Sequence, residues 1–120
     1  MILIVDDFAP GRFLHKRTLE QHGFQVREAG TAQEALNKVA ERVPKLVICD
    51  VNLPDRNGFW LCRELRTRVP DVPIVMMSAT YGDHATEQTA LFSGAAEFFP
   101  EPTDPDRLVE RVKRYIPSKK

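Results

Sequence analysis

Three short apolar runs in the sequence each end in small polar side chains that could act together in one reaction. Runs of this length, bounded by turn residues, are typical of strands that are buried on both faces. If these strands lie in one parallel sheet, their last side chains meet at the same edge of it. The sequence therefore predicts one site built from strand ends, with the polar members Asp6, Asp7, Asp50 and Ser78.

The acidic members of this set favour the binding of a hard divalent cation. Neighbouring strands lie about 4.8 Å apart, so the charges of Asp6, Asp7 and Asp50 would repel one another unless a cation neutralised them. Oxygen ligands of this kind suit Mg²⁺, which retains several waters when it binds to proteins. A single aspartate after a strand is commonly a turn residue, but the complete set favours a magnesium site.

A carboxylate in such a site can also attack a phosphoryl group and become an aspartyl phosphate. A metal ion would neutralise the charge on the transferring oxygens. Asp50 stands alone at the end of the run that we expect to be the most central strand, whereas Asp6 and Asp7 form a pair suited to hold the ion. We therefore expect Asp50 to be the nucleophile.

The elements that must position these residues alternate along the chain. Apolar runs predict strands at 2–5, 24–29, 46–49, 74–77 and 96–99. Helical spacing and capping signals predict helices at about 12–22, 31–43, 59–68, 84–93 and 105–116. Short connections between such elements favour an α/β fold, in which a parallel sheet carries helices on both faces.

Capping signals locate the starts of two of these helices. Thr31-Ala32-Gln33-Glu34 has the pattern T-x-x-E of a capping box, in which Thr31 and Glu34 each accept a hydrogen bond from a backbone donor. Asp104 and Pro105 are favourable as the N-cap and the first residue of the last helix. Pro44 closes the second helix, whose expected buried stripe is Ala35, Leu36, Val39, Ala40 and Val43.

The composition is that of one ordinary globular domain spanning residues 1–120. Of the 120 residues, 42% are hydrophobic and 28% are charged, which allows a modest core but no second domain. The 17 basic and 17 acidic residues cancel, so the overall charge attracts neither nucleic acid nor an anionic membrane. No apolar run approaches the length of a membrane span, and no leader precedes the first strand. We therefore expect a cytoplasmic protein that does not bind nucleic acid or membrane directly.

The cysteines and histidines show no spacing typical of a metal cluster. Cys49 lies in a predicted strand and Cys62 on the helix after it, and we expect both to be reduced, buried thiols. His15, His22 and His84 show no i, i+4 pairing. We expect these histidines on the surface or on helix flanks.

In their order and spacing these motifs resemble the receiver (CheY-like) domain of two-component response regulators, over nearly the whole chain. The matching segments are Ile-Val-Asp6-Asp7, Ile-Cys-Asp50-Val-Asn52-Leu-Pro54 with Gly58, Met-Met-Ser78-Ala79, and Gly94-Ala95 before the last strand. Each segment alone is weak, but the complete series is specific. The resemblance implies a flavodoxin-like sheet with the strand order 2-1-3-4-5.

The resemblance also implies roles for individual residues. Asp50 would accept a phosphoryl group from a histidine kinase or a phosphotransfer protein. Ser78 would bind a phosphoryl oxygen, and Phe98 matches the aromatic switch position of the family. The partner-binding surface would be formed by the fourth helix, the last strand and the last helix. The implied ligands of Mg²⁺ are Asp6 (through water), Asp7, Asp50 and the backbone carbonyl of Asn52.

The sequence departs from the family at Glu101. Receivers of this family usually carry a lysine there, before a proline, and this lysine pairs with the phosphoryl group. Because Glu101 inverts the charge, phosphorylation would be weaker, shorter-lived or differently transmitted, unless the side chain turned outward or an arginine replaced the lysine. The candidates for that replacement are Arg12, near the start of the first helix, and Arg56, in the loop after Asp50; for each of them the favoured interpretation is an ordinary solvated arginine.

Two functions are compatible with these residues. The first is a phosphorelay receiver that is phosphorylated on Asp50 and thereby switches a partner-binding surface. The second is a degenerate receiver that acts as a protein interaction module without phosphorylation, which Glu101 motivates. An enzyme such as an aspartate-nucleophile phosphatase fits less well, because that class typically carries Asp-x-Asp and Asn52 stands at the second position here. No GxGxxG or GxxxxGK motif indicates nucleotide binding.

Overall fold

The described strands belong to one parallel sheet. The computed structural model describes residues 1–78, 84–101 and 104–117, and within them five strands form a sheet in the order β2-β1-β3-β4-β5. All neighbouring pairs run parallel. The strands are β1 (Ile2–Val5), β2 (Val26–Ala29), β3 (Leu46–Asp50), β4 (Ile74–Ser78) and β5 (Glu97–Pro100). The predicted α/β fold and strand order are confirmed.

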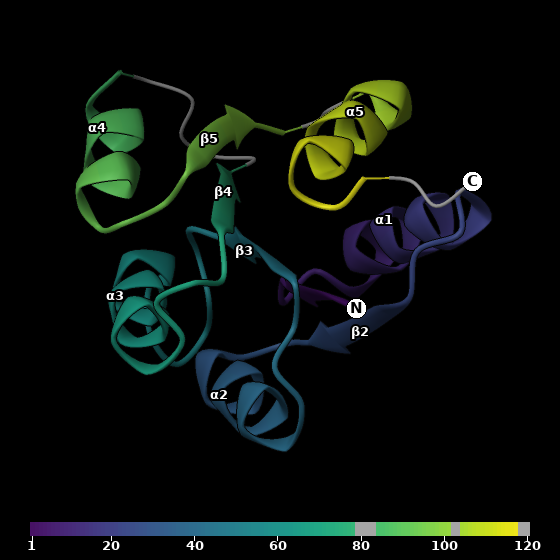
Figure 1. Ribbon diagram of the computed structural model, residues 1–120. Coiled ribbons are helices and arrows are strands. Elements are labelled where there is room, and N and C mark those ends of the chain that lie inside the picture. The colour runs from purple at the N-terminus through teal and green to yellow at the C-terminus, as the bar shows by residue number, and fades with distance from the viewer. Residues whose placement is uncertain (79–83, 102–103, 118–120) are drawn as a thin grey trace.

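Helices cover both faces of this sheet (Figure 1). On one face lie α1 (Ala9–Gln21) and α5 (Pro105–Tyr115). On the other face lie α2 (Ala32–Glu41), α3 (Gly58–Arg68) and α4 (His84–Phe92). Each helix among the described residues is too short or too polar to span a lipid bilayer.

Side chains of the central strands are buried on both faces, which explains why their sequence is continuously apolar. In β1, Leu3 packs in the cluster under α2 and α3, whereas Ile4 packs in the cluster under α1 and α5. Each such side chain contributes about 1.5–3 kcal/mol when it is fully buried. Cys49 and Cys62 are free and buried, as predicted.

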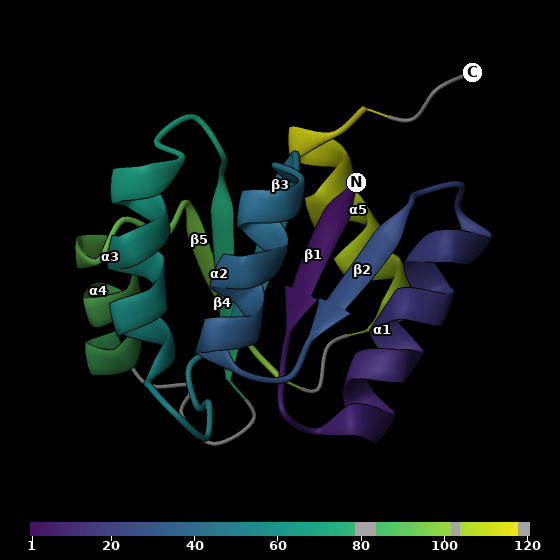
Figure 2. The ribbon, with the colours of Figure 1, turned by 90° about the horizontal axis from the view of Figure 1, so that it is seen from below.

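The strand order reverses at β1, and this reversal determines where a site can form. The chain passes from β1 to β2 on one side and returns to β3 on the other. In open parallel sheets such a reversal leaves a crevice outside the carboxyl ends of the strands. Val5 of β1 pairs with Cys49 of β3, so the residues after them leave the sheet side by side, at the lower edge in Figure 2.

The other elements lie within two residues of their predicted bounds, whereas α1 begins three residues early and the end of α2 leaves predicted core residues exposed. α1 begins at Ala9, earlier than predicted, because Pro10 lacks an N–H and is well suited to the first turn of a helix. α2 ends at Glu41, so Val43 lies beyond the helix and is 57% exposed. Ala40 is exposed as well. The predicted buried stripe is therefore wrong at these last two positions.

The predicted helix caps are present. Oγ1 of Thr31 accepts a hydrogen bond from the N–H of Glu34 at 3.0 Å, and the Asp104 side chain accepts one from the N–H of Asp106 at 2.8 Å. The Glu34 carboxylate accepts a hydrogen bond from the N–H of Gly30 at 2.6 Å. A standard capping box would reach the N–H of the N-cap itself, so Glu34 reaches one residue further back.

Candidate functional site

Three carboxylates converge beyond the carboxyl ends of β1 and β3. One oxygen from each of Asp6, Asp7 and Asp50 lies within 4.8 Å of the others. Asp6 and Asp7 follow β1 directly, and Asp50 is the last residue of β3. Asp6 is buried, Asp50 is half-buried and Asp7 is exposed, so the cluster is open to solvent on one side. The predicted convergence of these side chains is confirmed.

Burial and neighbouring negative charge raise the pKa of Asp50. Burial contributes most and the carboxylates of Asp6 and Asp7 add to it, so that the pKa of Asp50 rises from 3.8 to about 7. The N–H of Asn52 donates to Oδ1 of Asp50 at 3.1 Å and opposes this rise by stabilising the charged form. A divalent cation would offset the repulsion. Three crowded carboxylates open to solvent therefore fit a Mg²⁺ ion.

A close approach of α3 fixes the main chain at the end of β3. The N–H of Gly58 donates to the carbonyl oxygen of Val51 at 2.6 Å, and the N–H of Val51 donates to that of Met77 at 3.0 Å. A Cβ atom on Gly58 would lie 2.1 Å from the carbonyl oxygen of Asp50, which is closer than van der Waals contact allows. Glycine is therefore required here for α3 to pack against the Asp50 main chain.

Asp55 connects the loop after β3 to the start of α2. Its Oδ1 accepts a hydrogen bond from the N–H of Ala32 at 2.9 Å, and its Oδ2 accepts one from the N–H of Gln33 at 3.0 Å. These are backbone donors that a helix start leaves unpaired, and negative charge is favourable there. No sequence pattern indicates this contact, because a loop aspartate gives no information about a distant helix.

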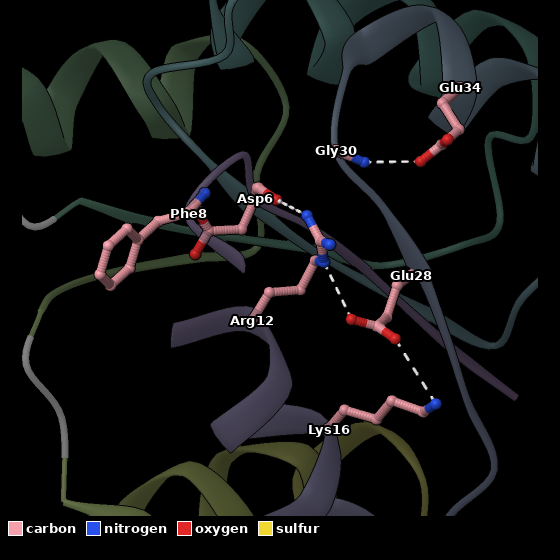
Figure 3. A network of polar contacts seen from close by, with 7 residues as sticks. All are labelled: Asp6, Phe8, Arg12, Lys16, Glu28, Gly30 and Glu34. Carbon is pink, nitrogen blue, oxygen red and sulfur yellow. Dashed lines mark hydrogen bonds and ion pairs between the residues drawn. The ribbon is translucent and has the colours of Figure 1, made fainter. Parts of the chain in front are cut away.

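Arg12 supports the turn that carries Asp6 (Figure 3). Its Nη1 donates to the backbone carbonyl of Asp6 at 2.7 Å, and its Nε donates to Glu28, which lies on β2, at 2.9 Å. Nζ of Lys16 lies 3.4 Å from the other oxygen of Glu28. The N–H of Phe8 donates to Oδ1 of Asp6 at 2.9 Å. The structure thus brings Arg12 to the main chain of the aspartate turn.

Arg56 contacts an aromatic ring. Its guanidinium carbon lies 4.6 Å from the centroid of the Trp60 ring, which is a cation–π distance. Trp60 belongs to the first turn of α3, where its N–H donates to the N-cap side chain of Asn57 at 2.8 Å. Arg56 is therefore placed against the start of α3.

Three further residues assigned by the resemblance lie near the cluster or in the core. Ser78 is buried at the end of β4, and its carbonyl oxygen accepts a hydrogen bond from the N–H of Glu101 at 2.7 Å. Asn52 is exposed beside Asp50. Phe98 is 9% exposed and packs in the apolar cluster under α2 and α3. Ala79, part of the matching motif, lies outside the described residues.

Glu101 contacts His15 of α1. Oε1 of Glu101 lies 3.2 Å from Nε2 of His15, and both side chains are mostly buried. The expectation that His15 lies on the surface or on a helix flank is wrong, because it occupies the same inward stripe of α1 as Thr18 and Leu19, where it is 8% exposed. The i, i+3, i+4 spacing of these three residues is the sequence signal that indicates its burial. The exposed positions of His22 and His84 agree with the expectation.

The sequence and the fold of this chain have counterparts in known proteins. A family model described as the response regulator receiver domain matches residues 2–113. The chain belongs to this receiver family. Among curated relatives, the transcriptional regulatory protein GltR of Pseudomonas aeruginosa is 37% identical over 117 residues, which cover 96% of this chain and 48% of the relative. The receiver spans about half the length of the curated relatives that it matches.

Solved receiver structures resemble this one closely. The receiver domain of NtrX from Brucella abortus has a TM-score of 0.91 at 32% identity, and the match covers 99% of this chain and 100% of that one. The CheY-like receiver domain protein from Methanospirillum hungatei JF-1 has a TM-score of 0.89 at 31% identity, with 94% and 90% covered. The fold is therefore the CheY-like flavodoxin fold.

Membership in this family defines the class of function. A response regulator receiver domain of a two-component system is a signalling module rather than a catalytic enzyme. Asp6, Asp7 and Asp50 form the acidic triad that is typical of a receiver Mg²⁺ site. Receiver domains interact with histidine kinases.

Proposed function

We propose that residues 1–120 act in the cytoplasm as one receiver domain that accepts a phosphoryl group on Asp50 from a histidine kinase or a phosphotransfer protein. The observation that carries this proposal is the position of Asp50, half-buried at the end of β3 and within 4.8 Å of Asp6 and Asp7 through their carboxylate oxygens. A carboxylate oxygen of Asp50 attacks the phosphorus atom. As the new O–P bond forms, the bond from phosphorus to the donor histidine nitrogen breaks, and the nitrogen keeps the electron pair.

The same residues supply the ligands of a Mg²⁺ ion. Asp6, Asp7, Asp50 and the backbone carbonyl of Asn52 would hold it, with Asp6 acting through water. When bound, the ion supplies positive charge that offsets the charge of the phosphoryl oxygens. Asp50, whose pKa is raised to about 7 by burial and by its acidic neighbours, would be held in its ionised form by this positive charge. Mg²⁺ is therefore the cofactor of the proposed reaction.

Ser78 and Phe98 would transmit the phosphorylated state. Ser78 ends the strand next to β3, where its hydroxyl can bind a phosphoryl oxygen. Phe98 lies on β5 two residues before Pro100, which is the partner of Ser78 in the sheet, so a change at Ser78 would reach Phe98 through adjacent strands. The surface formed by α4, β5 and α5 would then change its affinity for a downstream effector protein or domain. The energy of this switch comes from contacts that only the phosphorylated state makes.

Glu101 sets the expected stability of the phosphorylated state. The resemblance aligns Glu101 with the lysine that pairs with the phosphoryl group in most receivers. A charge-assisted hydrogen bond of that kind contributes about 1.5–3 kcal/mol. Because a carboxylate cannot donate it, we expect a phosphorylated state that forms more slowly or is lost sooner than in a lysine-containing receiver.

A second function is favoured by the same residue. A receiver with Glu101 at this position could act as a protein interaction module whose surface works without phosphorylation. In that case Asp50 would be a structural residue, and the affinity for a partner would not depend on a phosphodonor.

Intact-mass spectrometry separates the two functions. The protein is incubated with Mg²⁺ and acetyl phosphate and then weighed. The proposal predicts the addition of one phosphoryl group to the wild type, none to Asp50→Asn, and none in the presence of EDTA. If the wild type takes up no phosphoryl group under conditions that load a lysine-containing receiver, the interaction module is the better account.

A further inference from the structure

His15 is a polar side chain buried where helical spacing favours an apolar one. It shares the inward stripe of α1 with Thr18 and Leu19 and is 8% exposed. Its Nδ1 is buried and, among the residues that the structure describes, has no hydrogen-bond partner. A buried polar group that is left without a partner destabilises the folded state. A polar contact that offsets the burial of this imidazole must therefore be made by the other ring nitrogen, Nε2.

Glu101 is the residue that Nε2 contacts. Its Oε1 lies 3.2 Å from Nε2, and the two side chains are 15% and 10% exposed. The main chain of Glu101 is fixed independently, because its N–H donates to the carbonyl oxygen of Ser78 at 2.7 Å. The backbone of Glu101 is thus held next to β4, while its side chain extends to α1. A carboxylate with so little exposure requires hydrogen-bond donors.

The chemistry of the two groups determines which nitrogen carries the proton. An ionised carboxylate only accepts hydrogen bonds, so Nε2 of His15 must be the donor. Burial lowers the pKa of His15, although the charge of Asp6 opposes this effect. A neutral ring with its hydrogen on Nε2 leaves Nδ1 as an unpaired acceptor, whereas a protonated ring would bury an unpaired donor and a charge. The neutral Nε2–H form is therefore the favoured one.

We propose that His15 is a positioning residue that anchors the Glu101 carboxylate against α1 and thereby keeps it out of the acidic cluster. In agreement with this, the group of carboxylates whose oxygens lie within 4.8 Å of one another consists, among the described residues, of Asp6, Asp7 and Asp50, and Glu101 is not a member of it. A cation at this site would meet three carboxylates instead of four. The consequence for phosphorylation of Asp50 rests on the proposed function, but the anchor itself does not.

The first test reads the His15 ring directly. Two-dimensional ¹H–¹⁵N NMR of the imidazole groups at pH 7, without metal or phosphodonor, distinguishes the tautomers. The proposal predicts the Nε2–H form for His15 in the wild type and a mixture of tautomers in Glu101→Ala. A wild-type ring with its hydrogen on Nδ1, or an unchanged spectrum in Glu101→Ala, would overturn the anchor.

The second test measures Mg²⁺ affinity by isothermal titration calorimetry. His15→Leu removes the Nε2 donor of His15, and a Glu101 side chain that moves into the cluster should lower the Kd for Mg²⁺ about fivefold through its added charge. His15→Gln keeps a donor amide and should leave the Kd close to that of the wild type. His15→Leu/Glu101→Gln should return the Kd to the wild-type value, because the released charge is gone.

The two tests separate this inference from the proposed function. If the Kd is the same in His15→Leu and the wild type, or if its change persists in the double variant, His15 does not keep Glu101 out of the cluster. If the wild type binds no Mg²⁺ at all, the proposed metal-dependent function fails, while the tautomer of His15 still decides whether the anchor exists. The NMR test on the wild type requires no substitution at His15, so a folding defect of His15→Leu does not affect it.

Discussion

Arg12 donates from Nη1 to the backbone carbonyl of Asp6 at 2.7 Å, and so a side chain of α1 holds the main chain of the turn that carries Asp6 and Asp7. Its other contact, with Glu28 of β2, fixes the direction of the guanidinium. The hydrogen bond from Arg12 also lowers the pKa of Glu28. Glu28 therefore stays ionised and remains a charged partner for the guanidinium. The turn after β1 is therefore supported from two neighbouring elements.

Replacing Arg12 should weaken metal binding. We expect Arg12→Ala to raise the Kd for Mg²⁺ about tenfold, as is common when a residue that orients a ligand is removed. Lys16→Ala is a matched control, because Lys16 contacts Glu28 and its removal leaves the bond from Arg12 to Asp6 in place. Calorimetric titration of both variants is the measurement, and equal Kd values for them would show that Arg12 does not support the site.

Asp55 should stabilise the fold through α2. Asp55→Ala removes the acceptors of two backbone donors at the start of that helix, and loss of a cap typically costs about 0.5–2 kcal/mol. Urea unfolding of this variant should show that loss, whereas Asp71→Ala, at an exposed position, should change the free energy of unfolding by less than about 0.5 kcal/mol. Equal stability of the two variants would contradict the capping role.

Without metal, Asp50 should make the protein less stable as the pH rises. Its pKa is about 7 in the folded chain against 3.8 for the ordinary carboxyl. The folded state therefore binds the Asp50 proton more tightly than the unfolded state does. The stability that this difference adds is complete below pH 3.8, and it is lost as the pH rises through about 7.

This loss of stability with rising pH can be measured by comparing the wild type with Asp50→Asn, in which residue 50 cannot ionise. Between pH 5 and pH 8 in EDTA, we expect the wild type to lose about 1–3 kcal/mol more of its free energy of unfolding than Asp50→Asn, allowing for solvent screening. Added Mg²⁺ should remove the difference. Parallel pH profiles of the two proteins in EDTA would mean that the carboxylates do not interact as described.

Glu101→Lys should lengthen the lifetime of the phosphorylated protein. A lysine would supply the donor and the positive charge that Glu101 cannot, and a hydrogen bond of about 1.5 kcal/mol corresponds to roughly a tenfold change. The decay of phosphoprotein is followed by intact mass after the phosphodonor is removed. Glu101→Gln removes the negative charge and supplies a neutral amide donor, so its phosphoprotein lifetime should lie between those of the wild type and Glu101→Lys. Identical lifetimes for all three proteins would refute the role of this position in the stability of the phosphorylated state.

The sequence was sufficient to predict the parts of the site that depend on local pattern. An apolar run that ends in aspartate identifies a buried strand with its carboxylate at the edge of the sheet, and this holds for Asp6, Asp7 and Asp50. The capping residues Thr31 and Asp104 were predictable for the same reason, because each acts on backbone donors two or three residues away.

Contacts between distant segments could not be predicted in this way. Asp55 caps a helix that lies well before it in the chain, and His15 meets Glu101 only because α1 packs next to the segment after β5. The error at Val43 has a different origin, since apolar periodicity continues past the last residue of α2 and does not define where that helix ends.

The site of phosphoryl attachment is the most direct test of the account. The protein is treated with acetyl phosphate in Mg²⁺, digested rapidly at low temperature, and the phosphorylated peptide is sequenced by tandem mass spectrometry. We predict one modified residue, Asp50, and no modified peptide when EDTA replaces Mg²⁺. A phosphoryl group on Asp6 or Asp7, or uptake that is unaffected by EDTA, would contradict the assignment of Asp50 as the acceptor in a metal-dependent receiver.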